Sequence, residues 1–242
     1  MKRIILLSFT LLMTLGLWAQ EHHVSEEVIV KPPKFTGEKV QLQSNEMSIQ
    51  NYITENMQYP AEDLTYKREG TEVIRFTVET DGRLSNYEVV NSVSRAMDDE
   101  LIRVLSSTSG YWLPGQNNNV DVAMEREVAI ACKVLNEGLT ISQTDFKVVA
   151  TNYFKKGSKL LYTKHHPQRA IAKFDQGIRY LPYDTNLRVM RGYARFAAGD
   201  RDGAIADWKI VKEKTNIDNL KSLASTYSDL DGYAELINEV DE

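Results

Sequence analysis

The order of extended and helical patterns between Gln58 and Cys132 constrains the fold of this chain more than any other feature. Over 71–79 apolar residues alternate with polar ones, as they do in a strand that is covered on one face. A hairpin turn at Asp81-Gly82 leads to a second extended segment, 84–92, which carries apolar residues on both faces. The first two strands are therefore predicted as a hairpin, with the inward face of the second strand left open.

A helix and a third strand complete the pattern. Apolar residues recur at helical spacing from Ala96 to Leu105, and acidic residues stand near the start of that helix, where they favour the positive end of its dipole. A long alternating segment, 120–132, follows. We expect an α+β fold with the order α-β-β-α-β, in which helices cover one face of a three-stranded antiparallel sheet.

The first helix is predicted over 44–57. Ser44 or Asn45 would cap its start, and Pro60 follows its end. The apolar face of this helix consists of Met47, Ile49, Tyr52, Ile53 and Met57.

Four short motifs lie along this part of the chain. They are Pro33-Lys34-Phe35, Tyr59-Pro60, Asp81-Gly82 and Trp112-Leu113-Pro114-Gly115. Together they resemble the C-terminal domain of TonB energy-transducing proteins, and the resemblance places such a domain at 32–135.

This resemblance implies how the domain binds a partner. TonB domains are understood to hold the TonB-box peptide of outer-membrane receptors by adding it as a strand to the last strand of the sheet. The implied edge is Val120 to Ile130, flanked by Gln58, Tyr59 and Pro60; for Tyr59, Pro60 and Trp112, packing alone is an equal alternative. The implied contacts on the edge are Val120, Val122, Met124, Arg126, Val128 and Ile130.

The N-terminal residues have the pattern of an export signal. Met1-Lys2-Arg3 precedes an apolar run that ends before Ala19, and the run is short for a membrane span. We expect 1–19 to be cleaved, 20–31 to be a flexible segment and the protein to reside in the periplasm. The alternative is an inner-membrane anchor at 4–18, and membrane association is expected only in that case. The short segment before the first motif favours a soluble protein over a force-transmitting one, because it could not cross the periplasm.

Residues 143–242 follow a helical period and repeat internally. Ala170-Ile171-Ala172-Lys173-Phe174 matches Ala204-Ile205-Ala206-Asp207-Trp208 at an offset of 34, whereas Gly157 and Gly192 stand 35 apart. One extra residue is therefore expected near His165-His166-Pro167. This pattern resembles tetratricopeptide (TPR) repeats, in which small residues let helices approach closely; an unrelated bundle of helical hairpins is the alternative.

Arg188, Arg191 and Arg195 lie on one side of a predicted helix. They could form a basic groove for an acidic segment, or their stems could cover apolar neighbours while their heads stay in water. The charge of the chain also divides unevenly: residues 20–139 carry 11 basic and 20 acidic side chains, and residues 140–228 carry 16 basic and 8 acidic ones. We expect these two parts to attract each other.

No catalytic motif, metal-ligand pattern or cofactor-binding loop occurs in the sequence. The single cysteine, Cys132, continues the apolar face of the third strand and is predicted to be a buried thiol. The acidic composition and the export signal argue against nucleic acid as a partner. We therefore expect no enzyme, but a periplasmic protein that binds peptides or proteins in TonB-dependent outer-membrane transport, with the helical repeats as a second interaction module. The alternative is an envelope scaffold that uses the TonB-like fold for protein interaction without energy transduction.

Overall fold

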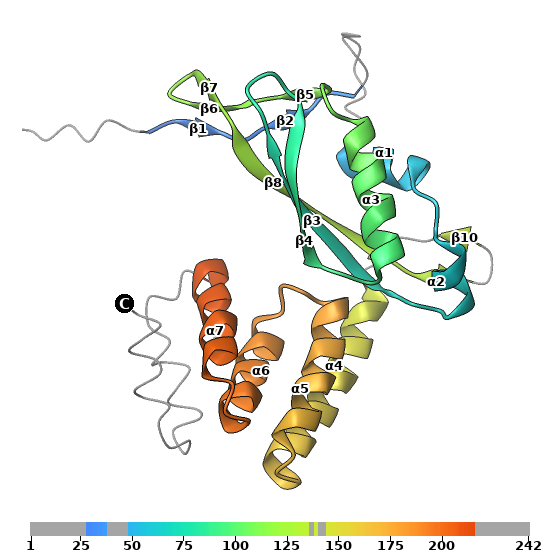
Figure 1. Cartoon of the computed structure of the whole chain (residues 1–242), viewed down its shortest axis with the longest axis vertical. Coiled ribbons are helices and arrows are strands. Elements are labelled where there is room, and N and C mark those ends of the chain that lie inside the picture. Colours follow the sequence, from blue (N-terminus) through green and yellow to red (C-terminus); the bar gives the residue numbers. More distant parts are fainter. Residues whose placement is uncertain (1–27, 38–47, 136–137, 140–143, 216–242) are drawn as a thin grey trace, which may run out of the picture.

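The computed structural model describes residues 28–37, 48–135, 138–139 and 144–215 (Figure 1). The strands are β1 (Val30–Lys31), β2 (Lys34–Phe35), β3 (Gly70–Val78), β4 (Leu84–Asn91), β5 (Trp112–Leu113), β6 (Gly115–Asn117), β7 (Val120–Val122), β8 (Met124–Cys132), β9 (Val134–Leu135) and β10 (Gly138–Leu139). The helices are α1 (Ile49–Asn56), α2 (Ala61–Thr65), α3 (Arg95–Ser107), α4 (Thr144–Ser158), the π-helical turn η1 (Lys159–Thr163), α5 (Pro167–Tyr180), α6 (Thr185–Ala197) and α7 (Arg201–Thr215).

The expected three-stranded antiparallel sheet is confirmed, with the strand order β4-β3-β8. Its third strand begins at Met124, whereas the first residues of the predicted segment 120–132 form β7 of another sheet. The central strand β3 pairs with β8 without interruption from Gly70↔Cys132 to Val78↔Met124. Helices α1 and α3 cover one face of this sheet, and the even-numbered residues of β3 and β8 supply that face of the core (Figure 1). The core residues are Phe35, Ile49, Ile53, Met57, Ile74, Phe76, Val78, Val93, Met97, Leu101, Val104, Leu105, Trp112, Val128, Ile130 and Cys132.

The start of α1 differs from the prediction. Ser48 is the N-cap, and its hydroxyl accepts a hydrogen bond from the backbone N–H of Asn51 at 3.1 Å. Ser48 has the extended backbone and the hydroxyl that a cap requires, so the cap at Ser44 or Asn45 is wrong for the helix observed. Those two residues and Met47 lie outside the described residues.

A ribbon of short strands extends from the central sheet. In it β6 lies between β1 and β7, while β2 pairs with β5. This second pairing brings Phe35 against Trp112, with ring centroids 5.3 Å apart. The Pro-x-Phe and Trp-x-Pro-Gly motifs therefore meet in space, and both rings belong to the core.

The C-terminal described part consists of two helical hairpins, α4–η1–α5 and α6–α7 (Figure 1). A side-chain carbon on Gly157 would lie 2.5 Å from the ring of Phe174, and one on Gly192 would overlap the ring of Trp208. The repeat found in the sequence thus has a physical counterpart, because in each hairpin a glycine admits the aromatic residue of the following helix. Membership in the TPR family is not shown and stays a prediction.

The extra residue of the first repeat lies in a helix, not in the loop. The turns 164–166 and 198–200 have the same length, and both have a left-handed residue in the middle, His165 (φ 52°) and Gly199 (φ 83°). The difference is absorbed by the π-helical turn η1, because a π turn holds one more residue than an α turn. The prediction that placed the insertion near His165 was wrong by a few residues.

The second face of the central sheet is covered at one end by the helical hairpins. The hydroxyl of Thr71 donates to the carbonyl oxygen of Tyr180 at 2.7 Å, and Nδ2 of Asn91 donates to that of Arg179 at 3.1 Å. Both carbonyls are at the C-terminal end of α5, where helical hydrogen bonds run out. A side-chain carbon on Gly70 would lie 2.8 Å from Cγ of Arg179, so only glycine admits this approach.

The uneven charge predicted attraction between the two parts of the chain. Among the described residues, one ion pair joins them at this junction: Lys214 and Glu127, whose charged atoms are 3.9 Å apart. The junction is otherwise held by the neutral hydrogen bonds of Thr71 and Asn91 and by the hydroxyl of Tyr183, which donates to Glu127.

A pair of carboxyl groups lies beneath the start of α3. Glu72 is fully buried, and its Oε2 accepts a hydrogen bond from the N–H of Val93 at 2.9 Å. Its Oε1 and the Oδ1 of Asp98 are buried oxygens without other partners among the described residues. Burial, with Asp98 as the next cause, raises the pKa of Glu72 to about 9. Glu72 is therefore protonated at neutral pH.

This shift predicts a pH dependence of stability. Glu72 holds its proton in the folded state up to pH about 9, whereas in the unfolded chain it loses the proton near 4.5. Its stabilising contribution is thus fully present below the unfolded pKa and declines as the pH rises toward the folded pKa, by at most about 1.4 kcal/mol per pH unit. Urea unfolding over this pH range should show the decline, and Glu72→Gln should make it shallower. Equal slopes for the two proteins would contradict the assignment.

Candidate functional site

The candidate site is the outer edge of one long strand formed by β7 and β8. β7 is the outermost strand of the ribbon and β8 is an outermost strand of the central sheet, and only Ala123 separates them. Within the described residues, each pairs with another strand on one side only. The edge that the sequence implied, Val120 to Ile130, therefore exists as an unpaired strand edge.

Hydrogen-bond alternation indicates that the two unpaired edges lie on the same side. Asn118 and Asn119 have positive φ and form a two-residue turn, so the flanking pair Asn117↔Val120 points its backbone groups into the ribbon. In the hairpin between β3 and β4, the N–H of Glu79 donates to the carbonyl oxygen of Arg83, so the backbone groups of Glu79 point toward β4. Those of the neighbouring Val78 therefore point the other way, toward Met124 of β8. Even-numbered residues of β7 and β8 thus face existing partners, and odd-numbered ones point their N–H groups outward.

Side chains along this edge differ from the predicted set of contacts. Val120 is 64% exposed, while Val122, Met124 and Arg126 are half-buried. Val128 and Ile130 lie in the core, and like the other even-numbered residues they direct their backbone groups at β3. Neither their side chains nor their N–H groups therefore point toward an added strand, and their prediction as contacts needs this correction. The binding role of all six residues stays a prediction.

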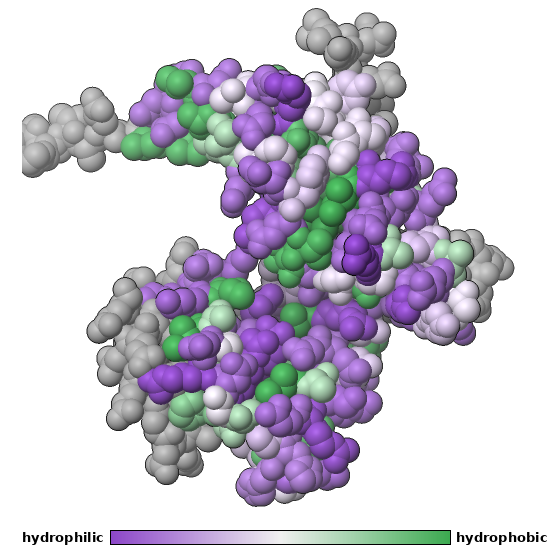
Figure 2. Space-filling model, in the orientation of Figure 1, coloured by the Kyte–Doolittle hydropathy of each residue, from purple (hydrophilic) through white to green (hydrophobic). Residues whose placement is uncertain are grey.

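Space beside the edge is open on the face shown in Figure 2. The molecule is hollowed there between the β1–β6–β7 ribbon and the helical hairpins, and apolar residues gather on the ribbon. Tyr183, in the turn between α5 and α6, donates a hydrogen bond from its hydroxyl to Glu127 of β8. Helical residues therefore contact the side chain of Glu127 on the sheet face that carries Arg75.

The predicted flank, Gln58-Tyr59-Pro60, lines a surface pocket of about 490 Å³ against α3. The backbone N–H of Gln58 donates to Oε1 of Glu100 at 2.7 Å. The hydroxyl of Tyr59 donates to the carbonyl oxygen of Arg68 at 2.5 Å, and burial raises the pKa of Tyr59. The pocket is lined by Gln58, Tyr59, Pro60, Ala61, Ala96, Asp99, Glu100 and Arg103.

The packing alternative has direct support for two aromatic residues. Trp112 is buried, and its Nε1 donates to the hydroxyl of Thr108 at 3.0 Å. Tyr59 is half-buried and packs against the same core. Both side chains have structural roles that are independent of any ligand. Burial also raises the pKa of the Cys132 thiol to about 12, so this cysteine is protonated and unreactive at neutral pH.

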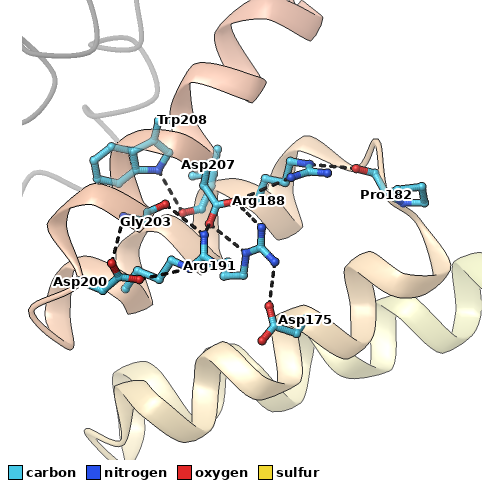
Figure 3. Close-up of polar contacts among 10 residues, drawn as sticks. Asp175, Pro182, Arg188, Arg191, Asp200, Gly203, Asp207 and Trp208 are labelled. Carbon is cyan, nitrogen blue, oxygen red and sulfur yellow. Dashed lines mark hydrogen bonds and ion pairs between the residues drawn. The ribbon is translucent and has the colours of Figure 1, made fainter. Parts of the chain in front are cut away.

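The three arginines predicted as a basic groove meet a buried carboxylate instead (Figure 3). Asp207 is 1% exposed and accepts hydrogen bonds from Arg191, at 2.9 and 2.5 Å, and from Arg195 at 2.9 Å. Arg188 lies 3.7 Å from it and donates to the carbonyl oxygen of Pro182. These guanidinium groups therefore do not form an open basic groove. The alternative, in which they stay in water, also fails for Arg188, because that residue is buried.

Sequence reasoning missed Asp207 as the centre of this network. Asp207 stands in the repeated five-residue block at the position that Lys173 occupies in the first repeat. The sequence did carry a signal for this network. It is an acidic residue at the repeat position that is basic in the first repeat, one helix after a row of arginines.

Comparison with known proteins bears on the identity of this fold. No curated protein and no solved structure matches the chain. No helix within the described ranges has the length and apolar character needed to cross a membrane. One protein-family model matches, and it covers the hairpin, α3 and the edge strand β8: residues 55–133 are similar to the C-terminal domain of the Gram-negative bacterial TonB protein.

Proposed function

We propose that this protein binds extended peptide segments in the periplasm by adding them as a strand to the outer edge of β7 and β8. The observation that carries the proposal is the unpaired edge itself, which runs through two sheets and borders a hollow. Backbone groups on such an edge bind a strand with little dependence on side chains. The TonB C-terminal match over 55–133 supports an envelope protein that interacts with other proteins.

The finer parts of the proposal concern partner and setting. The TonB box of outer-membrane receptors is the proposed peptide, and the protein acts in TonB-dependent transport without catalysing a reaction. The two helical hairpins serve as a TPR-like second interaction module. Their matched glycine–aromatic contacts support this interpretation.

An envelope scaffold without energy transduction is the second candidate. It is favoured by the junction between the helical hairpins and the sheet, where Thr71 and Asn91 cap the end of α5. Such a contact suits a protein that presents one composite surface to its partners.

Replacing Ala123 by proline tests the edge. Ala123 is exposed and its N–H is one of those that point outward, so proline removes one donor and adds bulk without breaking a ladder. A peptide selected on the intact protein from a random phage-displayed library should bind about 5- to 150-fold more weakly, or about 1–3 kcal/mol. Ala129→Pro should act in the same direction, and Gln58→Ala should have a smaller effect.

The matched control is Ala123→Val, which adds bulk but keeps the N–H. Hydrogen exchange provides a second measurement, because bound peptide should protect the outward amides of Asp121, Ala123 and Glu125. Selected peptides that bind Ala123→Pro as tightly as the parent protein, and leave these amides unprotected, would refute edge addition. If binding is instead lost in Arg191→Glu, recognition belongs to the helical hairpins.

A further inference from the structure

The strand formed by β7 and β8 has two chemically distinct faces at its open end. Val120, Val122 and Met124 lie on one face, which continues into the core. Asp121, Glu125 and Glu127 lie on the other, since side chains alternate along a strand. Up to Met124, the edge where a ligand strand would pair is therefore apolar on one side and acidic on the other; Arg126, which is half-buried, follows Met124 on the apolar side.

The ribbon adds one more exposed valine to this face. Register places Val30 of β1, Asn117 of β6 and Val120 of β7 in one row, so a polar residue lies between the two valines, and Val30 is 57% exposed. This row ends at Val120, next to the open edge. An apolar ligand side chain beside Val120 would shield this exposed valine from water.

The opposite face holds a chain of polar contacts that ends at the same edge. Nζ of Lys31 donates to Oε1 of Gln116 at 3.3 Å, and Nε2 of Gln116 donates to Oδ1 of Asp121 at 2.9 Å. Asp121 is exposed and is the last residue of this row. Its carboxylate is thus held by Gln116 at the position where the next strand would begin.

The acidic residues further along differ in how far they are neutralised. Glu127 is paired with Arg75 at 3.2 Å and also meets Lys214 and Tyr183. Glu125 is exposed and makes no hydrogen bond or ion pair within the described part of the chain, where its charge is attracted to that of Arg75. Asp121 and Glu125 consequently leave negative charge facing a ligand, two positions to either side of Ala123.

We propose that the partner of this edge is an extended segment in which apolar residues alternate with basic ones, the apolar side chains lying beside Val120 and Val122 and the basic ones beside Asp121 and Glu125. The inference rests on the proposed function and specifies its ligand class. Opposite charges on neighbouring strands attract, whereas acidic side chains in the same positions are repelled. Because side chains alternate, a shift by one residue would turn the basic groups onto the apolar row, so the pattern also fixes the register.

The test uses two synthetic peptides long enough to span β7 and β8, one of alternating valine and lysine and one of alternating valine and glutamate. The full chain should bind the lysine peptide and reject the glutamate peptide. Asp121→Asn combined with Glu125→Gln should weaken binding of the lysine peptide about 2- to 30-fold. Asp121→Lys combined with Glu125→Lys should reverse the preference.

The charge-matched control combines Glu55→Gln and Asp202→Asn, two exposed acids on α1 and α7. This control should leave the affinities for the lysine and glutamate peptides unchanged, because at physiological salt charges far from the bound peptide are screened. Equal binding of the two peptides by the parent chain, or an equal loss in the control, would overturn the ligand class. Edge addition would still stand if Ala123→Pro weakens the selected peptides. Failure of both experiments would remove the proposed function as well.

Discussion

Replacing Asp207 by alanine is expected to destabilise the helical hairpins by about 3–5 kcal/mol, because it removes the counter-charge that three arginines share. Arg191 and Arg195 both donate to this carboxylate, and Arg188 is buried beside it. Without Asp207 the guanidinium groups would remain crowded together and partly removed from water. Burial already lowers the pKa of Arg188, and the loss of its counter-charge would leave like charges to repel each other.

Thermal and urea unfolding followed by circular dichroism would measure this loss. Asp207→Asn should be nearly as damaging, because it keeps the shape but removes the charge. Asp175→Ala is the matched control: this residue also pairs with Arg191, at 2.7 Å, but it is half exposed, so the loss should stay within about 1 kcal/mol. Similar losses in Asp175→Ala and Asp207→Ala would mean that burial of the carboxylate is not what matters.

Replacing Gly70 by valine is expected to separate the helical hairpins from the sheet. A side chain at this position would meet both the stem and the carbonyl oxygen of Arg179, the latter at 2.9 Å. The carbonyl belongs to the end of α5 and cannot move aside like a side chain. Overpacking of this kind costs about 1–3 kcal/mol, and here undocking relieves it.

Distances between spin labels at Asn86 and Asp202, both exposed, would report the separation. Cys132 is buried and would not compete for the label. The parent protein should give a narrow distance distribution and Gly70→Val a broad one, whereas Thr77→Val, on the same strand but away from Arg179, should resemble the parent. A narrow distribution in Gly70→Val would show that the junction tolerates the added side chain.

The central sheet could be predicted because its signals are local. Alternation at Ile74, Phe76 and Val78 and the turn at Asp81-Gly82 determine the hairpin, and the alternation after Val120 determines the third strand. These patterns depend on one strand at a time and on one covered face. The turn and the three strands therefore follow from the sequence, although it left the inward face of the second strand open.

The second covered face could not be predicted in the same way. Val73 is fully buried, yet its neighbours on that face, Thr71 and Arg75, are polar, so the alternation gives no sign of a covering layer. Small residues at Ala129 and Ala131 are compatible with close packing, but alanine is common in strands without it. The contacts of Thr71 and Asn91 with α5 join residues far apart in sequence, and composition carries no signal for them.

The candidate edge was identified by resemblance, while its chemistry came from register. The contacts that the resemblance implies are the even-numbered residues, and nothing in the sequence alone distinguishes Asp121 and Glu125 from other acidic residues. Their relevance depends on which backbone groups point outward and on the row from Lys31 to Asp121, both of which require the pairing of β1, β6 and β7.

The capped end of α5 limits how independently the two halves of this protein can evolve. A helical array is usually exchangeable between proteins as a whole, since each of its hairpins packs only against neighbouring hairpins. Here the last carbonyl groups of α5 are satisfied by Thr71 and Asn91, which belong to the other half of the chain. Recombination at 136–143 would transfer the helices without Thr71 and Asn91, whose side chains bond to the end of α5. We therefore expect selection to keep the two halves of the chain together.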